Sequence, residues 1–201
     1  MKMITGDMTP SQKRRFFLLI LMFFMFAGVV SGTLIFISNP ENERLRTAWL
    51  SQYLTGIAVM TPFKVFACSL IPVVLMLVFQ LLCGLFAFGQ PFCVSTLVMR
   101  GIAGGIASAS IYAQYGYKGF FLILIMLVPM LIFNMYILSL GARESIRLSN
   151  MTAGFIFGKN NDGVCEIRLY LIKFLVLAGF ALASAVIESA LIYFFADFFN
   201  P

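Results

Sequence analysis

The sequence contains no histidine, and only 11% of its 201 residues are charged, whereas soluble globular domains average about 25%. Its four cysteines, Cys68, Cys83, Cys93 and Cys165, are scattered and lack the C-x-x-C spacing of metal sites. We therefore predict no zinc, haem or iron–sulfur centre and no other cofactor. The sequence also has no Walker motif, no Ser/His or Ser/Lys grouping and no pair of intramembrane aspartates, so we expect that it is not an enzyme.

Long apolar runs dominate the rest of the chain, in which 61% of the residues are hydrophobic. These residues come in blocks instead of recurring at a helical or strand period, which is typical of integral membrane proteins. A helix of about 20 apolar residues crosses a hydrocarbon core of about 30 Å. We predict an all-α, polytopic membrane protein, a single transmembrane domain over residues 1–201. Its five transmembrane helices are expected at about residues 16–37, 63–88, 91–114, 117–141 and 169–196.

The basic residues indicate the orientation of these spans. The net charge of +6 does not point to nucleic acid, because the lysines and arginines flank the apolar runs. They are concentrated at residues 13–15 and 143–173, on the same predicted side, which the positive-inside rule assigns to the cytoplasm. We therefore expect the N-terminus and residues 142–168 inside, and residues 38–62 and the C-terminus outside.

The third and fourth spans form a helical hairpin around which the chain is organised. A Gly- and Tyr-rich segment from Gln114 to Gly119 separates them, which suits a tight turn at a membrane surface. Pro129 lies inside the fourth span. Because proline lacks the backbone N–H of the helical ladder and clashes with the preceding turn, we expect a kink there.

Three polar side chains lie at a similar predicted depth on three different spans. Gln80, Arg100 and Asn134 are roughly 12, 13 and 10 Å from the inner surface, taking about 1.5 Å per helical residue. We expect an intramembrane polar layer in which Arg100 donates to the carbonyls of both amides. The alternative is an Arg100 that extends to the inner headgroups.

Glu188 lies in the last span, roughly 28 Å along it, and therefore in the outer third. This depth matches Lys118 or Lys64 better than Arg100, so we expect an outer charge pairing with one of these lysines. The alternative is the acid of a proton-coupled transporter. Without a second acid or a histidine to form a relay, the structural pairing is favoured.

The third span also carries a face of small residues, Gly101, Gly104, Gly105 and Ser108. Small residues spaced by four allow helix backbones to approach closely in membranes. The sequence does not distinguish a neighbour within this chain from a second protein, and it leaves homo-oligomerisation open.

The outer loop contains a predicted amphipathic helix. Leu45, Trp49, Tyr53 and Ile57 recur every four residues and form one apolar face. This face either lies on the outer leaflet or packs on the end of the bundle. In both cases its polar side is available to a partner.

Several short motifs occur in a fixed order along the second half of the chain. They are Gly89-Gln90-Pro91, Arg100-Gly101, Gly104-Gly105, the turn from Tyr115 to Phe121, Pro129 and Val186-Ile187-Glu188. This ordered set, with the five-span plan, resembles the stage II sporulation protein M family of bacterial membrane proteins over about residues 85–196. The family commonly has a polar residue after the proline, where this chain has Met130.

The resemblance implies a non-enzymatic scaffold in the bacterial cell membrane. Members of this family recruit two membrane-anchored cell-wall hydrolases, the stage II sporulation proteins D and P, to the sporulation septum. There the hydrolases thin the peptidoglycan during engulfment. The alternative function is a membrane subunit of a transporter, such as the permease partner of an ATPase.

Overall fold

The computed structural model describes residues 10–38, 62–156 and 167–196, and within these ranges every residue is helical except the turn at residues 86–89. The predicted all-α class is therefore confirmed. The elements are α1 (Pro10–Ser38), α3 (Pro62–Leu85), α4 (Gln90–Leu122), the π-helical segment η2 (Ile123–Leu127), α5 (Val128–Ile156) and α6 (Ile167–Ala196). The predicted outer amphipathic helix, with Leu45, Trp49, Tyr53 and Ile57, lies outside the described residues.

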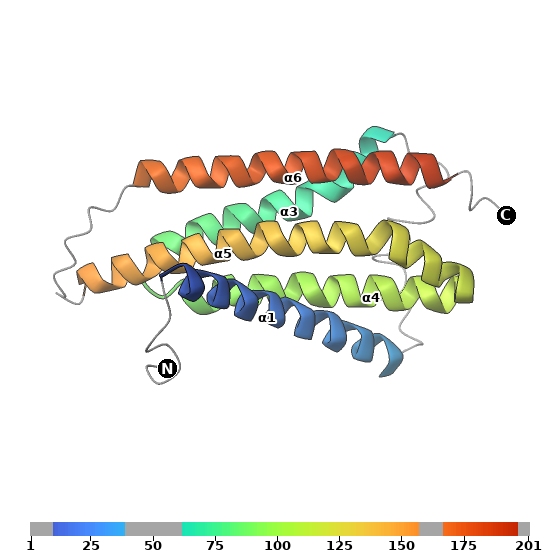
Figure 1. Cartoon of the computed structure of the whole chain (residues 1–201), viewed down its shortest axis with the longest axis horizontal. Coiled ribbons are helices and arrows are strands. Elements are labelled where there is room, and N and C mark those ends of the chain that lie inside the picture. The colour runs from blue at the N-terminus through green and yellow to red at the C-terminus, as the bar shows by residue number, and fades with distance from the viewer. Residues whose placement is uncertain (1–9, 39–61, 157–166, 197–201) are drawn as a thin grey trace.

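The helices lie side by side with their long axes roughly aligned, as Figure 1 shows. The start of α1, the turn between α3 and α4, the end of α5 and the start of α6 lie at one end of the bundle, on the left in the figure. This end carries Arg15, Arg143, Arg147 and Arg168, and we call it the basic end. The clustering of cations at one end is the arrangement that the positive-inside rule requires.

Three helical stretches are long and apolar enough to cross a membrane, namely Arg15–Ser38, Gln90–Ala113 and Ile167–Leu191. A fourth span results if the bent pair Tyr115–Ile125 and Val128–Gly154 counts as one. Within α3 the apolar stretch Ser69–Leu85 is shorter. The structure thus confirms several helices that are long and apolar enough to span a membrane. A fifth span at residues 63–88 and the orientation of the termini stay predictions.

The predicted hairpin is present, and its turn depends on one glycine. Gly116 has φ 55° and ψ −128°, a backbone conformation with positive φ that glycine adopts without a Cβ clash. Among the described residues it is the one position with positive φ. Figure 1 shows α4 and α5 running alongside each other in opposite directions.

The expected kink near Pro129 is also present. The helix axis bends by 42° between Tyr115–Ile125 and Val128–Gly154. The π-helical segment Ile123–Leu127 lies directly before Val128 and Pro129. A proline clashes with the carbonyl four residues before it, here that of Ile125, and a wider π turn relieves this clash.

Helix α5 continues well beyond the predicted end of the fourth span at Gly141, since it ends at Ile156. Gly141 packs on α3, where an added Cβ would lie 2.5 Å from Gln80 Oε1. The glycine therefore permits close helix packing and does not end the helix. The additional turns of α5 bring Ser145 and Ser149, both fully buried, to the end of α3.

Candidate functional site

The small-residue face of α4 is covered by α1 of the same chain. An added Cβ on Gly101 would lie 3.0 Å from Gly28 Cα, and one on Gly105 would lie 2.9 Å from Thr33 N. Both distances are shorter than van der Waals contact, so the two backbones touch only because the side chains are missing. The sequence did not distinguish a neighbour within this chain from a second protein. For Gly101 and Gly105 the structure shows that the neighbour is α1 of the same chain.

The other two residues of the predicted face also have partners within the bundle. An added Cβ on Gly104 would lie 2.6 Å from Leu131 Cδ2, so Gly104 faces α5. Ser108 donates to the carbonyl of Gly105 at 2.9 Å, within its own helix. The face is therefore a core element that holds α1 and α5 against α4, and a partner protein would have to contact another surface.

The three residues of the predicted polar layer are all inside the bundle. Gln80, Arg100 and Asn134 have exposed fractions of 0%, 5% and 2%. An arginine that extended to the headgroups would be exposed, so burial favours the interior position for Arg100. These three buried polar side chains come from three different helices, α3, α4 and α5.

The expected hydrogen bonds from Arg100 are absent. Gln80 Oε1, Arg100 Nε and Asn134 Nδ2 are buried without a hydrogen-bond partner among the described residues. Gln80 Nε2 instead donates to Thr96 Oγ1 at 2.9 Å, and Thr96 donates to the carbonyl of Cys93 at 2.8 Å. The prediction that Arg100 donates to Gln80 is therefore wrong, although both residues are buried as expected.

The register of the helices explains this difference. The contact between Gln80 and Thr96 places Gln80 one helical turn away from Arg100 along α4. On the other side, Gly104 faces Leu131, and α4 and α5 are antiparallel (Figure 1). Arg100 lies one turn before Gly104 on α4, and Asn134 lies one turn after Leu131 on α5. Because the two helices are antiparallel, Arg100 and Asn134 are therefore at the same level. The depths estimated from the sequence are accurate only to about one helical turn. They therefore cannot show whether two side chains at a similar depth are close enough to form a hydrogen bond.

Glu188 is buried on α6, with an exposed fraction of 6%. Lys118 lies in the turn region after Gly116 and is exposed. In the described part of the chain the carboxylate forms no ion pair with Lys118, so that pairing is wrong. The physical reason is that Glu188 faces the bundle whereas Lys118 faces its surroundings. Lys64 belongs to α3, and its side chain lies outside the described residues.

Hydroxyl groups of α5 and α6 bond to the backbone at the end of α3. Ser145 donates to the carbonyl of Gln80 at 2.7 Å, and Tyr170 donates to that of Leu81 at 3.0 Å. Ser149 donates to the carbonyl of Phe86 at 2.8 Å, beyond the helix end, and this carbonyl also accepts from the backbone N–H of Gly89 at 3.1 Å. Sequence reasoning missed this group, although the spacing of Ser145 and Ser149 by four would have placed both on one helix face.

An ion-pair cluster joins α5 to α6 at the basic end. Arg143 Nη2 lies 2.7 Å from Glu144 Oε1, and Lys173 Nζ lies 2.7 Å from Glu144 Oε2. The carboxylate is nearly buried, with a side-chain exposed fraction of 10%. The sequence predicts only that these basic residues mark the cytoplasmic side, and it does not indicate that they meet Glu144.

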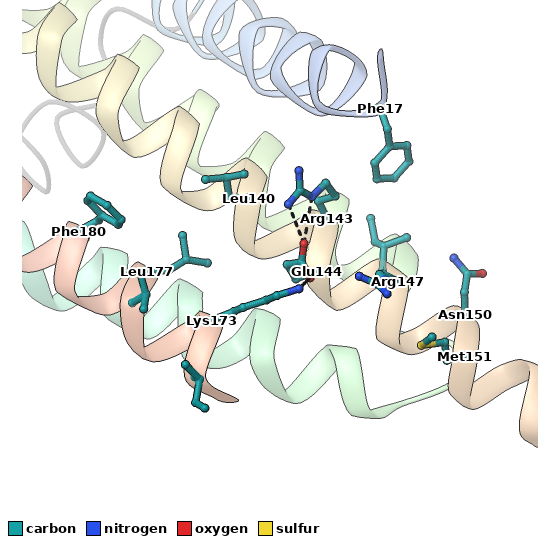
Figure 2. A pocket seen from close by; sticks show the side chains of 13 residues that line it. Phe17, Leu140, Arg143, Glu144, Arg147, Asn150, Met151, Lys173, Leu177 and Phe180 are labelled. Atoms are coloured by element: carbon teal, nitrogen blue, oxygen red, sulfur yellow. Dashed lines mark hydrogen bonds and ion pairs between the residues drawn. The ribbon is translucent and has the colours of Figure 1, made fainter. Parts of the chain in front are cut away.

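The same cluster lies in a groove of about 970 Å³ that is bordered by α1, α5 and α6. Figure 2 shows Arg143, Glu144 and Lys173 in its middle and Arg147 and Asn150 toward one end. Leu140, Leu177 and Phe180 line the opposite end. The groove therefore changes from charged to apolar along the axis of the bundle.

Comparison with known proteins adds no relative, since no family model, curated protein or solved structure matches this chain. Among the described residues no three His, Cys, Asp or Glu side chains converge as metal ligands. Two structural features of the described residues are relevant to function. One is the groove at the basic end, and the other is the surface that the helices present to lipid.

Proposed function

We propose that this chain is a non-enzymatic membrane scaffold that gathers partner proteins by lateral contact between helices. The observation that supports this proposal is an exposed face of small residues on α6. Gly179 has no atom within 4 Å of an added Cβ, and Ala183 and Ala190 are exposed on the same side of the helix. Small residues allow close approach of helices. The exposed face of α6 is therefore available to a helix of another protein, whereas the small-residue face of α4 is already covered within this chain.

The exposed fractions of the surrounding side chains support this assignment. Leu175 is 75% exposed and Val186 is 55% exposed, and these apolar side chains lie one turn before Gly179 and one turn after Ala183 on the same side of α6. A single transmembrane helix fits such a strip, because it needs only one helical face for docking. The partners that the family resemblance implies are the stage II sporulation proteins D and P. On this proposal the chain recruits these hydrolases to the sporulation septum for engulfment.

The test is recovery of partners with the full chain, purified in mild detergent after brief crosslinking in cells. Gly179→Leu and Ala183→Leu should reduce recovery of the partners at least tenfold, because the added side chains fill the contact strip. The protein itself should stay abundant, because these positions face open space. Ala113→Leu, at an exposed position on α4, is the matched control and should leave recovery unchanged.

Unchanged recovery with Gly179→Leu and Ala183→Leu would contradict the proposed face. Wall-hydrolysing activity of the purified chain alone would contradict the scaffold function itself.

A transporter subunit is the second candidate, and a specific observation favours it. Ser69 Oγ, Arg100 Nε, Asn134 Nδ2 and Ser139 Oγ are buried on α3, α4 and α5 without hydrogen-bond partners among the described residues. Polar groups facing the interior of a membrane bundle often mark a substrate path. Co-purification of an ATPase in place of wall hydrolases, with ATPase activity dependent on Arg100, would establish this function.

A further inference from the structure

Among the described residues that line it, the groove at the basic end carries more positive than negative charge. Arg143, Arg147 and Lys173 line it together with a single carboxylate, that of Glu144. Both oxygens of this carboxylate already accept from Arg143 and Lys173, each at 2.7 Å. Arg147 forms no ion pair or hydrogen bond with any other residue in the described part of the chain, and it is exposed. Among the described lining residues, three cations against one anion leave a net charge of +2 for a ligand.

The size of the groove and the side chains that line it suit an amphipathic ligand. Its volume of about 970 Å³ lies near the upper end of the range of about 300–1,000 Å³ for small-molecule sites. In Figure 2 the arginines occupy one part and Leu140, Leu177 and Phe180 follow toward the middle of the bundle. Lys173 is the seventh residue of α6, which starts at Ile167, and so lies within its first two turns. The charges are therefore near the predicted membrane surface.

We propose that this groove binds an anionic phospholipid. The phosphate lies against Arg143, Arg147 and Lys173, whose N–H groups donate to phosphate oxygens. One acyl chain follows the apolar wall of Leu177 and Phe180 toward the membrane centre. Basic pockets between transmembrane helices bind anionic headgroups in this way.

A partner helix fits this groove less well than a phospholipid. Transmembrane helices carry their own lysines and arginines at the cytoplasmic flank. Such a helix would place positive charge against Arg143, Arg147 and Lys173 at the same depth. A second copy of this chain in parallel orientation meets the same repulsion. An anionic headgroup supplies the missing negative charge instead.

The first test measures lipid binding to the full-length protein in mild detergent by native mass spectrometry. Dioleoyl-phosphatidylglycerol and dioleoyl-phosphatidylcholine are titrated separately. We expect the wild-type protein to retain phosphatidylglycerol preferentially. Arg147→Gln should weaken phosphatidylglycerol binding about fivefold, because one basic residue contributes about 1 kcal/mol toward an anionic headgroup. Binding of phosphatidylcholine should not change.

Arg168→Gln is the matched control, because Arg168 is an exposed arginine of α6 that does not line the groove. It should retain wild-type binding of phosphatidylglycerol. Equal retention of the two lipids by the wild-type protein would overturn the proposal. An equal loss with Arg147→Gln and Arg168→Gln would also overturn it, since this result indicates only attraction by the overall charge.

The second test blocks the acyl-chain part of the groove. Val176 lines the groove, whereas its neighbour Leu175 does not and is 75% exposed. Val176→Trp should abolish specific retention of phosphatidylglycerol, and Leu175→Trp should not. Equal retention by both variants would refute the acyl-chain position. If Val176→Trp instead converts a dimer to a monomer, or releases one defined protein partner with no change in lipid, the occupant is a protein and the lipid assignment is wrong.

Discussion

The backbones of α1 and α4 meet at Gly28 and Gly101, where an added Cβ on Gly101 would lie only 3.0 Å from the Cα of Gly28. Each glycine thus makes room for the other across the helix pair. An added Cβ on Gly28 would likewise lie 2.5 Å from the carbonyl oxygen of Val98. Because these neighbours are backbone atoms, they cannot rotate away from an added methyl group.

Gly101→Ala should therefore destabilise the folded protein. Overpacking a tight contact costs about 1–3 kcal/mol, which should lower the detergent thermal-unfolding midpoint by several degrees. The matched control is Gly179→Ala, where no atom lies within 4 Å of the new methyl group. That variant should be neutral or slightly more stable, since alanine is the better helix former. Equal midpoints for the two variants would refute the close contact.

Thr96→Val should weaken the junction between α3 and α4. It removes the oxygen that accepts from Gln80 Nε2 at 2.9 Å and keeps the side-chain shape. Hydrogen bonds between helices in membranes contribute about 0.6–1.7 kcal/mol, and we expect a loss of this size in unfolding titrations with sodium dodecyl sulfate. The control is Thr152→Val, since among the described residues Thr152 bonds only to the carbonyl of Leu148 in its own helix. A loss as large in the control would show that the cost does not come from the Gln80 contact.

Arg100→Met should stabilise the protein or leave its stability unchanged. Arg100 is 5% exposed and forms no ion pair with another described residue, and replacing a buried charge by an apolar side chain of similar volume is often favourable by about 1–4 kcal/mol. The measurement is the same detergent titration, with activity in cells as the second readout. A more stable variant without function would assign Arg100 a binding role. A large loss of stability would instead reveal a partner for its charge.

The orientation of the bundle can be tested by cysteine labelling. In a variant without its four native cysteines, a cysteine in place of Arg147 should react with an impermeant reagent only after the cells are permeabilised. Tyr117 lies at the opposite end of the bundle and is 87% exposed, so a cysteine there should react in intact cells. Labelling at position 147 in intact cells would invert the predicted topology.

The sequence by itself determined the class of the protein and the position of the hairpin. Runs of apolar residues predict membrane helices wherever they are long enough, because lipid offers the backbone no hydrogen-bond partners. Gly116 and Pro129 act on the local backbone, so their turn and kink followed from residue type alone. The cost of exposing a charge to lipid left two positions for Arg100, the bundle interior and the inner headgroups, and its burial in the structure decides for the interior.

Only the tertiary structure decided which faces of the helices meet. Gly101 and Gly179 are both glycines in apolar helices, yet one is covered by α1 and the other faces open space. Gln80 bonds to Thr96 and not to Arg100 because the helices pair in a register offset by one turn. Glu144 and Lys173 are 29 residues apart in the sequence and meet through the packing of α5 on α6. Such contacts depend on the rotation and axial shift of each helix, which hydropathy along a single chain does not encode.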